Sequence, residues 1–284
     1  MKTFQGAFLG AEQQRLMYIG MVPDDAPKGL VALFHGYGEH MGRYKHVMSE
    51  LVQHGYIVYG LDHRGHGRSG GIRASIEHFD YFVDDAHMLV QLARKRHPNL
   101  ARFVLGHSMG GLIATHYALR HQAALDGLVL SGPALVIGDD VSPMMKRMSG
   151  LLARVTPHLP VVPLSTSAES VLSRDPAVQE AFDSDPLTYK GQMRARLGYE
   201  MMQAAAAARA RFAELTLPLL VMYGEADQLV NPSGARQIHA EARSRDKTLK
   251  GWPGARHEIY NEIERNDVIV YTISWLDQHV PQGA

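Results

Sequence analysis

The chain has 284 residues, 45% of them hydrophobic, which is enough to bury the core of one large α/β domain or two small ones. Lysine plus arginine equals aspartate plus glutamate at 29 each, so no basic surface points to a nucleic-acid partner. Cysteine is absent, which excludes disulfides, thiolate nucleophiles and cysteine metal sites. We expect a cytoplasmic protein, because the N-terminus has no apolar core typical of a secretory signal and no run approaches the roughly 18 apolar residues that span a bilayer.

In chain order, short apolar runs alternate with amphipathic stretches over most of the sequence. Residues 3–9 and 15–22 predict the two strands of a hairpin joined at Gly10. Continuous apolar runs then predict buried strands at 29–34, 56–61, 103–105 and 127–130. Helices with one apolar face are predicted between these strands at 43–54, 81–96 and 112–120.

The same alternation returns near the end of the chain. A strand at 219–223 precedes a helix at 232–242, and a short strand at 248–252 precedes a helix at 268–279. Strand–helix alternation of this kind predicts an α/β fold. The central sheet should be mostly parallel, with helices on both faces and right-handed crossovers.

One interval, residues 136–215, interrupts the alternation. It is rich in proline and methionine, no strand is evident in it, and residues 192–212 form a strongly helical, alanine-rich stretch. We therefore expect a helical insertion after one strand of the sheet and before the next. Residues 1–135 and 216–284 should form the main domain, and residues 136–215 should form a cap, or lid, over it.

The cap interval contains more apolar side chains than a small helical insertion needs for its own packing. Met144, Met145 and Met148 are among them and are candidate substrate contacts. One interpretation places these side chains on the underside of the cap, against the main domain. The other makes them an entry for an acyl chain, since methionine adapts to flexible ligands. A cap of this composition would also allow transient contact with a membrane surface.

The stretch 103–111 carries the motif on which the functional prediction depends. An apolar run of strand length leads into Gly106-His107-Ser108-Met109-Gly110, and a helix follows. Gly-x-Ser-x-Gly between a strand and a helix is typical of a nucleophile elbow, a sharp turn that lifts the serine hydroxyl above the backbone. The turn strains the serine backbone, and the glycines let the strand and helix approach closely. Ser108 is therefore the candidate nucleophile.

A serine at an elbow needs a base to take its proton and a carboxylate to orient that base. In α/β-hydrolases the acid follows the serine in the chain, and the histidine comes last. Asp227 lies in the loop directly after a late predicted strand, and His257 lies between the last strand and the last helix. They are the candidate acid and base. Glu225 is an alternative acid, as are Asp139 and Asp140 after the preceding strand.

Two backbone N–H groups are candidates for the oxyanion hole. One belongs to Met109, the residue after the nucleophile. The other belongs to Tyr37, in the loop after an early strand. Glycines on both sides of Tyr37 would let the backbone approach a substrate closely.

Motifs along nearly the whole chain resemble those of the monoacylglycerol lipase family. Besides the elbow Gly106-His107-Ser108-Met109-Gly110-Gly111, they are His35-Gly36-Tyr37-Gly38-Glu39-His40 with Arg43-Tyr44, Asp62-His63-Arg64-Gly65-His66-Gly67-Arg68-Ser69, Asp185-Pro186-Leu187, Gly224-Glu225-Ala226-Asp227, and His257-Glu258-Ile259-Tyr260-Asn261-Glu262. The first of these loops is the most specific, because many α/β-hydrolases share the elbow but few carry Gly-Glu-His followed by Arg-Tyr.

The resemblance implies an α/β-hydrolase fold with a helical cap, and it implies neither a metal nor a cofactor. It implies hydrolysis of a monoacylglycerol to glycerol and a fatty acid through an acyl-enzyme. Ser108 would be the nucleophile, His257 the base and Asp227 the orienting acid. The N–H groups of Tyr37 and Met109 would form the oxyanion hole.

Three further residues are candidate contacts at the polar end of the substrate pocket: Glu39, Arg43 and Tyr260. Glu39 and Arg43 lie four residues apart near a predicted helix start. We favour an ion pair that holds the oxyanion loop over a contact with glycerol hydroxyls, because opposite charges at this spacing fix a loop whatever the substrate. Tyr260 follows the candidate base at a position where the family pattern varies.

Other functions remain open on the sequence alone. The same triad supports a lysophospholipase, a general carboxylesterase or a carbon–carbon bond hydrolase, because fold and triad do not fix the substrate. A non-catalytic ligand-binding protein is a more remote alternative, since serine, aspartate and histidine are all present in the required order. The expected partner is a small lipid ester, met either in the cytoplasm or at the periphery of a membrane.

Overall fold

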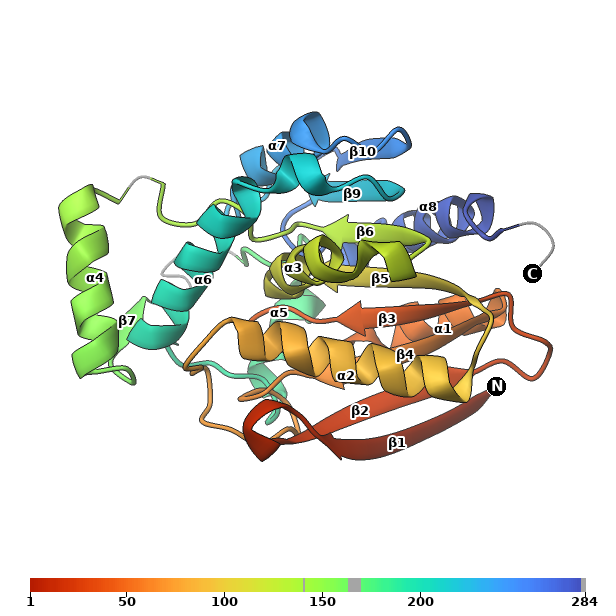
Figure 1. The fold of residues 1–284 in the computed structure, drawn as a ribbon, viewed down its shortest axis with the longest axis horizontal. Helices are drawn as coiled ribbons and strands as arrows, with labels where there is room; N and C mark the ends of the chain where they lie inside the picture. The colour runs from red at the N-terminus through yellow and green to blue at the C-terminus, as the bar shows by residue number, and fades with distance from the viewer. Residues whose placement is uncertain (140, 163–169, 282–284) are drawn as a thin grey trace.

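The strands of the central sheet lie side by side in the order β1-β2-β4-β3-β5-β6-β9-β10 (Figure 1). In chain order they are β1 (Lys2–Leu9), β2 (Arg15–Val22), β3 (Gly29–Phe34), β4 (Tyr56–Asp62), β5 (Ala101–His107), β6 (Gly127–Ser131), β9 (Leu219–Gly224) and β10 (Lys247–Trp252). β2 pairs antiparallel with β1 and β4, and all other neighbours are parallel. The computed structural model describes residues 1–139, 141–162 and 170–281. The predicted hairpin and mostly parallel sheet are confirmed.

Helices cover both faces of this sheet. In chain order the α-helices outside the interval between β6 and β9 are α1 (Lys45–Gln53), α2 (Asp80–Arg96), α3 (Met109–His121), α7 (Ser233–Glu241) and α8 (Arg265–Gln278). The 3₁₀ helices are η1 (Ala11–Gln13), η2 (Met41–Tyr44), η3 (Gln122–Ala124), η4 (Phe212–Glu214) and η5 (Ile259–Asn261). α2, α3 and α7 pack on one face, and α1 and α8 pack on the other.

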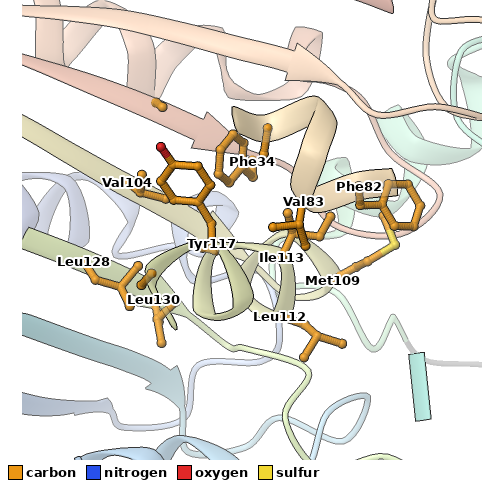
Figure 2. Close-up of a cluster of buried hydrophobic side chains, with 14 of the residues drawn as sticks. Phe34, Phe82, Val83, Val104, Met109, Leu112, Ile113, Tyr117, Leu128 and Leu130 are labelled. Carbon is orange, nitrogen blue, oxygen red and sulfur yellow. The ribbon is translucent and has the colours of Figure 1, made fainter. Parts of the chain in front are cut away.

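The strand β3 shows how both faces become apolar. Its residues alternate between the two cores: Phe34 joins the cluster with α2 and α3, and Leu33 joins the cluster with α1 and α8. Figure 2 shows the first cluster, in which Ile113 and Tyr117 of α3 lie with Phe34 and Val104 of the sheet. A strand buried on both faces explains why the sequence shows a continuous apolar run there.

The strand order reverses between β3 and β5. From β3 the chain moves outward to β4, then returns to the other side of β3 as β5. The loops after β3 and β5 therefore leave the same edge of the sheet in different directions. In open α/β sheets, such a switch point is where ligands bind. The loop after β3 holds Tyr37, and β5 ends one residue before Ser108.

Between β6 and β9 the chain leaves the sheet and forms a separate group of elements. They are α4 (Pro143–Val155), β7 (Pro160–Val162), α5 (Pro176–Ser184), β8 (Met193–Arg194) and α6 (Ala195–Arg209). α6 packs on α3, where the His116 ring donates to the Ala204 carbonyl at 2.9 Å. α4 lies beyond α6, away from the sheet (Figure 1). None of the helices in the described ranges is both long and apolar enough to cross a bilayer.

Differences from the predicted elements are small and have local causes. β7 and β8 pair antiparallel although no strand is evident in that interval, because strands of three and two residues are too short to show an alternating pattern. The helix predicted from residue 43 begins as an α-helix only at Lys45. Its first turn is the 3₁₀ helix η2, which His40 caps by accepting the Gly42 N–H at 3.1 Å.

The contact between β5, α3 and the end of β3 predicts a specific sensitivity to added volume. A Cβ on Gly110 would lie 2.1 Å from the Phe34 carbonyl oxygen, which is backbone and cannot rotate away. We therefore expect Gly110→Ala to lower the free energy of unfolding by about 1–3 kcal/mol in urea denaturation. Gly198→Ala in α6 is the matched control, because its nearest neighbour is the flexible Met193 side chain. It should be neutral or stabilising, and equal losses in both variants would contradict this packing constraint.

Candidate active site

Ser108 lies at the sharp turn between β5 and α3. Its backbone has φ 54° and ψ −118°, outside the regions that L-residues ordinarily occupy. The turn is held from two sides: the Ser108 N–H donates to the Ser131 carbonyl at 3.0 Å, and the Ser108 carbonyl accepts the Ala134 N–H at 3.1 Å. A strained serine fixed in this way is the local geometry predicted for a nucleophile elbow.

His257 and Asp227 are in direct contact. The His257 Nδ1 donates to the Asp227 Oδ2 at 2.7 Å, and both side chains are almost completely buried. A carboxylate only accepts hydrogen bonds, so the neutral imidazole carries its proton on Nδ1 and leaves Nε2 free to act as a base. The other carboxylate oxygen accepts the N–H groups of Leu229 and Val230, each at 2.9 Å, which fixes the direction of the carboxylate.

The imidazole of His257 lies in the region of the elbow. A Cβ on Gly132 would be 3.4 Å from the His257 ring, and Gly132 follows Ser131, which receives the Ser108 N–H. The ring of His107, next to Ser108 in the chain, has its centroid 4.7 Å from that of His257. Burial lowers the pKa of His257, but Asp227, Glu258 and Glu39 together raise it above its usual value.

The loop after β3 approaches Ser108 from the other side. A Cβ on Gly36 would lie 3.0 Å from the Ser108 Cβ, so only glycine lets this loop come so close. Gly38 has φ 75°, which glycine also favours. Within the described part of the chain, no acceptor is recorded for the Tyr37 N–H. The N–H of Met109, the first residue of α3, has no acceptor within its helix.

Glu39 and Arg43 form the predicted ion pair, with Arg43 Nη1 2.7 Å from Glu39 Oε2. Glu39 Oε1 accepts the Gly36 N–H at 2.5 Å and the Tyr44 hydroxyl at 2.6 Å. Arg43 makes two further hydrogen bonds to Glu258, at 2.7 and 2.8 Å. The structural role favoured from the sequence therefore has direct support. Sequence reasoning missed Glu258, because nothing in a sequence links Arg43 to a carboxylate 215 positions away.

The interval between β6 and β9 makes several contacts with the loop after β3 and with η2. The His40 Nε2 donates to Asp185 Oδ2 at 2.8 Å, and the Tyr189 N–H donates to the Gly38 carbonyl at 2.7 Å. The Arg43 guanidinium lies over the Phe182 ring, 5.1 Å from its centroid. Residues 182–189 are therefore fixed to the loop that carries Tyr37.

Other candidates from the sequence lie farther from these contacts. Tyr260 is buried in the core under α8, with its hydroxyl 2.9 Å from the Thr272 hydroxyl. Met144, Met145 and Met148 are 59–69% exposed on α4, so they do not pack against the main domain. The interpretation that these methionines form the underside of the cap is wrong, because that side of α4 is formed by other residues such as the buried Ala153.

Two of the alternative acids, Asp139 and Glu225, make no contact with His257 among the described residues. Asp139 forms a salt bridge to Arg209 of α6 at 2.9 Å, and Glu225 is exposed on the loop that also carries Asp227. Asp140 lies outside the described residues. In the described ranges, no three His, Asp or Glu side chains are arranged to hold a metal ion.

A group of buried histidines lies under the loops after β3, β4 and β5. Burial lowers the pKa of His63 to about 3, of His66 to about 4 and of His107 to about 3, and it lowers the pKa of His35 well below 6.5. The ring centroids of His35 and His63 are 4.3 Å apart, so a positive charge on one ring opposes protonation of the other. All four are held neutral in the folded state at neutral pH.

These histidines predict a loss of stability in mild acid. In the unfolded chain these histidines take up protons below about pH 6.5, whereas in the folded chain His63 and His66 do so only near pH 3–4. Their contribution to stability therefore falls as pH decreases through that window. His63→Phe should reduce this slope by up to about 1.4 kcal/mol per pH unit in urea denaturation between pH 7.5 and 5. The substitution suits the site, because both ring nitrogens of His63 lack a partner and Phe34 and Phe82 flank the ring. The exposed control His54→Phe should keep the wild-type slope, and an unchanged slope in both variants would contradict the prediction.

The chain is similar to known proteins over most of its length. The family described as "Serine aminopeptidase, S33" matches residues 25–264. A monoacylglycerol lipase of Mycolicibacterium smegmatis is 40% identical over 274 residues, which cover 96% of this chain and 97% of that protein. The human monoglyceride lipase is 33% identical, with 95% of this chain and 89% of that protein covered.

The structure is also similar to that of a monoacylglycerol lipase. The crystal structure of a monoacylglycerol lipase from Paleococcus ferrophilus matches with a TM-score of 0.79 and 28% identity, and the match covers 98% of this chain and all of that one. The resemblance predicted from the motifs is thereby confirmed. The chain belongs to the monoacylglycerol lipase family of α/β-hydrolases, within the group described as serine aminopeptidase S33.

Proposed function

We propose that this protein is a serine hydrolase that cleaves monoacylglycerols to glycerol and a fatty acid. The observation that carries the proposal is the backbone of Ser108, held at φ 54° between β5 and α3 in the same region as the buried His257–Asp227 pair. The substrate class is supported by relatives named as monoacylglycerol lipases that align over almost the whole chain.

In the first half of the reaction, Ser108 Oγ attacks the ester carbonyl while His257 Nε2 takes the hydroxyl proton. The carbonyl oxygen becomes an oxyanion, which the N–H groups of Tyr37 and Met109 stabilise. Asp227 stabilises the imidazolium formed at His257. The C–O bond to glycerol then breaks, His257 donates its proton to the leaving oxygen, and the acyl group stays on Ser108.

In the second half, water takes the place of glycerol. His257 removes a proton from the water as its oxygen attacks the acyl carbonyl, and the same two N–H groups hold the second oxyanion. The bond to Ser108 Oγ breaks, and the serine regains its proton from His257. Residues 136–215 act as a cap that receives the acyl chain. Residues 182–189 form the part of this cap fixed to the oxyanion loop.

Ser108→Ala tests the assignment of the nucleophile. We expect it to reduce kcat for 1-octanoylglycerol by at least about 10³-fold and to abolish labelling by a fluorophosphonate. The matched control is Ser184→Ala, an exposed serine on α5, which should keep both properties. Retention of activity within tenfold of the wild type in Ser108→Ala would disprove the mechanism. A wild type that hydrolyses lysophosphatidylcholine or triacylglycerols faster than monoacylglycerols would overturn the substrate class.

We further propose that α4 contacts the surface of an anionic lipid membrane. Its exposed apolar side chains Met144, Met148, Leu151 and Val155 follow one another at intervals of four, three and four residues, which places them in one stripe along the helix. The helix also carries Lys146, Arg147 and Arg154 and no acidic residue. An apolar stripe with cationic neighbours is typical of helices that lie in the membrane interface.

Leu151→Ser tests this contact. Because a buried leucine contributes about 1.5–3 kcal/mol to transfer from water, the variant should partition into phosphatidylglycerol vesicles at least about tenfold more weakly in co-sedimentation. Its hydrolysis of a soluble short-chain p-nitrophenyl ester should not change. Val270→Ser on α8, also an exposed apolar helix residue, is the control and should sediment like the wild type. An equal loss in both variants, or no vesicle binding by the wild type, would contradict the proposal.

A further inference from the structure

Three buried charged side chains connect the loop that carries Tyr37 to the loop that carries His257. They are Glu39 and Arg43, from the first loop and η2, and Glu258, from the second. The residue exposures are 2% for Glu39 and 4% for Glu258, and the Arg43 side chain is 9% exposed. We refer to these residues as the Glu39–Arg43–Glu258 cluster.

The cluster holds the oxyanion loop through a backbone bond. Glu39 Oε1 accepts the Gly36 N–H at 2.5 Å, three residues back along the chain. This bond takes the Gly36 N–H out of use as an oxyanion donor and closes the turn around Tyr37. The Tyr44 hydroxyl donates to the same oxygen at 2.6 Å, and Arg43 donates to the other oxygen at 2.7 Å. The Glu39 carboxylate is therefore bonded at both oxygens.

The cluster holds the histidine loop through the other carboxylate. Glu258 follows His257 directly. Its Oε1 accepts a hydrogen bond from Arg43 Nη1 at 2.7 Å, and its Oε2 accepts one from Arg43 Nη2 at 2.8 Å. This two-bond arrangement fixes the angle between the groups as well as their distance. Asn261 donates to Glu258 at 2.8 Å from within the same loop. Arg43 is thus the shared partner of two carboxylates that belong to two functional loops.

We propose that the Glu39–Arg43–Glu258 cluster sets the position of the oxyanion donor relative to the base, and that none of its members contacts the substrate. The three are positioning residues. The inference rests on the proposed ester hydrolysis, because an oxyanion and a base are needed only if Ser108 attacks a carbonyl. It replaces the alternative in which Glu39 and Arg43 bind glycerol hydroxyls, since each of their charged groups already has protein partners.

Two esters with the same acyl chain separate the two roles. 1-Octanoylglycerol releases glycerol, whereas p-nitrophenyl octanoate releases p-nitrophenolate and has no glycerol hydroxyls. A positioning residue acts on the oxyanion that both esters form, whereas a glycerol contact acts on one ester only. Because a displacement of about 1 Å costs up to about 10²-fold in rate, Glu39→Gln should lower kcat/KM by about 10–10²-fold. The loss should be equal for the two esters within about threefold.

A pH profile gives a second readout, which a merely structural role would not change. The charges that act on His257 are those of Asp227, Glu258 and Glu39, and His107 lies beside its ring. The cation Arg43 faces Glu39, Glu258 and His107. Arg43 holds the pKa of Glu258 below its usual value although burial opposes this, so Glu258 is charged at neutral pH. Removing a negative charge lowers the pKa of His257. The acid limb of kcat/KM in Glu258→Gln should therefore shift to lower pH.

Asp85→Asn is the matched control. Asp85 is a fully buried carboxylate on α2 that pairs with Arg64 at 2.6 Å and makes no contact with the two functional loops in the described structure. The control should lose thermal stability, yet keep kcat/KM within about threefold and keep the wild-type pH profile. If Glu39→Gln does not fold, Tyr44→Phe removes one hydrogen bond to Glu39 without changing any charge. This variant should lower kcat/KM by about 2–10-fold, again equally for both esters.

The outcomes are distinct. A loss more than tenfold larger on 1-octanoylglycerol than on p-nitrophenyl octanoate would show that the cluster binds glycerol. Unchanged kcat/KM in a folded Glu39→Gln protein, or the same losses in Asp85→Asn, would also overturn the proposal. Failure of the wild type to hydrolyse either ester would instead reject the proposed function, so the two failures cannot be confused.

Discussion

The structure depends on how closely the end of β3 and the first turn of α3 approach each other. The carbonyl oxygens of Phe34 and His35 occupy the position that a side chain at Gly110 would need. In the same way, the Gly110 carbonyl oxygen occupies the position that a side chain at Gly106 would need. This contact holds Ser108 in a conformation that an isolated peptide would leave. It also brings Gly36 next to Ser108, so one packing constraint places both the nucleophile and the loop expected to receive the oxyanion.

Charge is distributed around this point in two different ways. His257 and Asp227 form a buried pair that must change its protonation during the proposed reaction, and Asp227 is held by two backbone N–H groups. The histidines His35, His63 and His107 are instead kept neutral by burial. His107 lies next to His257, and its neutral state avoids like-charge repulsion when the His257 ring becomes an imidazolium.

The sequence predicted the elements of the sheet well, because β3, β4 and β9 are buried along their whole length and produce apolar runs, as β5 does from Phe103 to Leu105. The sequence also predicted that Ser108, Asp227 and His257 lie at the same edge of the sheet, because each follows a strand and the carboxyl ends of parallel strands meet at one edge. Partners distant in the chain left no such signal. Arg43–Glu258 and His40–Asp185 join loops more than 140 residues apart, and neither hydrophobic periodicity nor local spacing reports such a pair.

The sequence also could not predict which face of α4 is exposed. Its methionines show the spacing of an apolar helix face, and this pattern is the same whether the face packs against protein or is exposed. Only the structure shows that Gly150 faces Tyr199 of α6 while Met144 and Met148 point outward. The direction of the Tyr260 side chain could not be predicted either. Its position near His257 in the chain suggested a pocket residue, although its ring lies in the core.

The uneven attachment of the segment between β6 and β9 has a consequence for enzyme redesign. Asp185 and Tyr189 are bonded to the loop after β3, so substitutions at these two residues are expected to disturb the position of that loop. α4 makes no such bond within the described chain, and its outward side chains can be exchanged without moving any group near Ser108. Variants that aim to change behaviour at a lipid surface while keeping turnover should therefore vary α4 and leave Asp185 and Tyr189 intact.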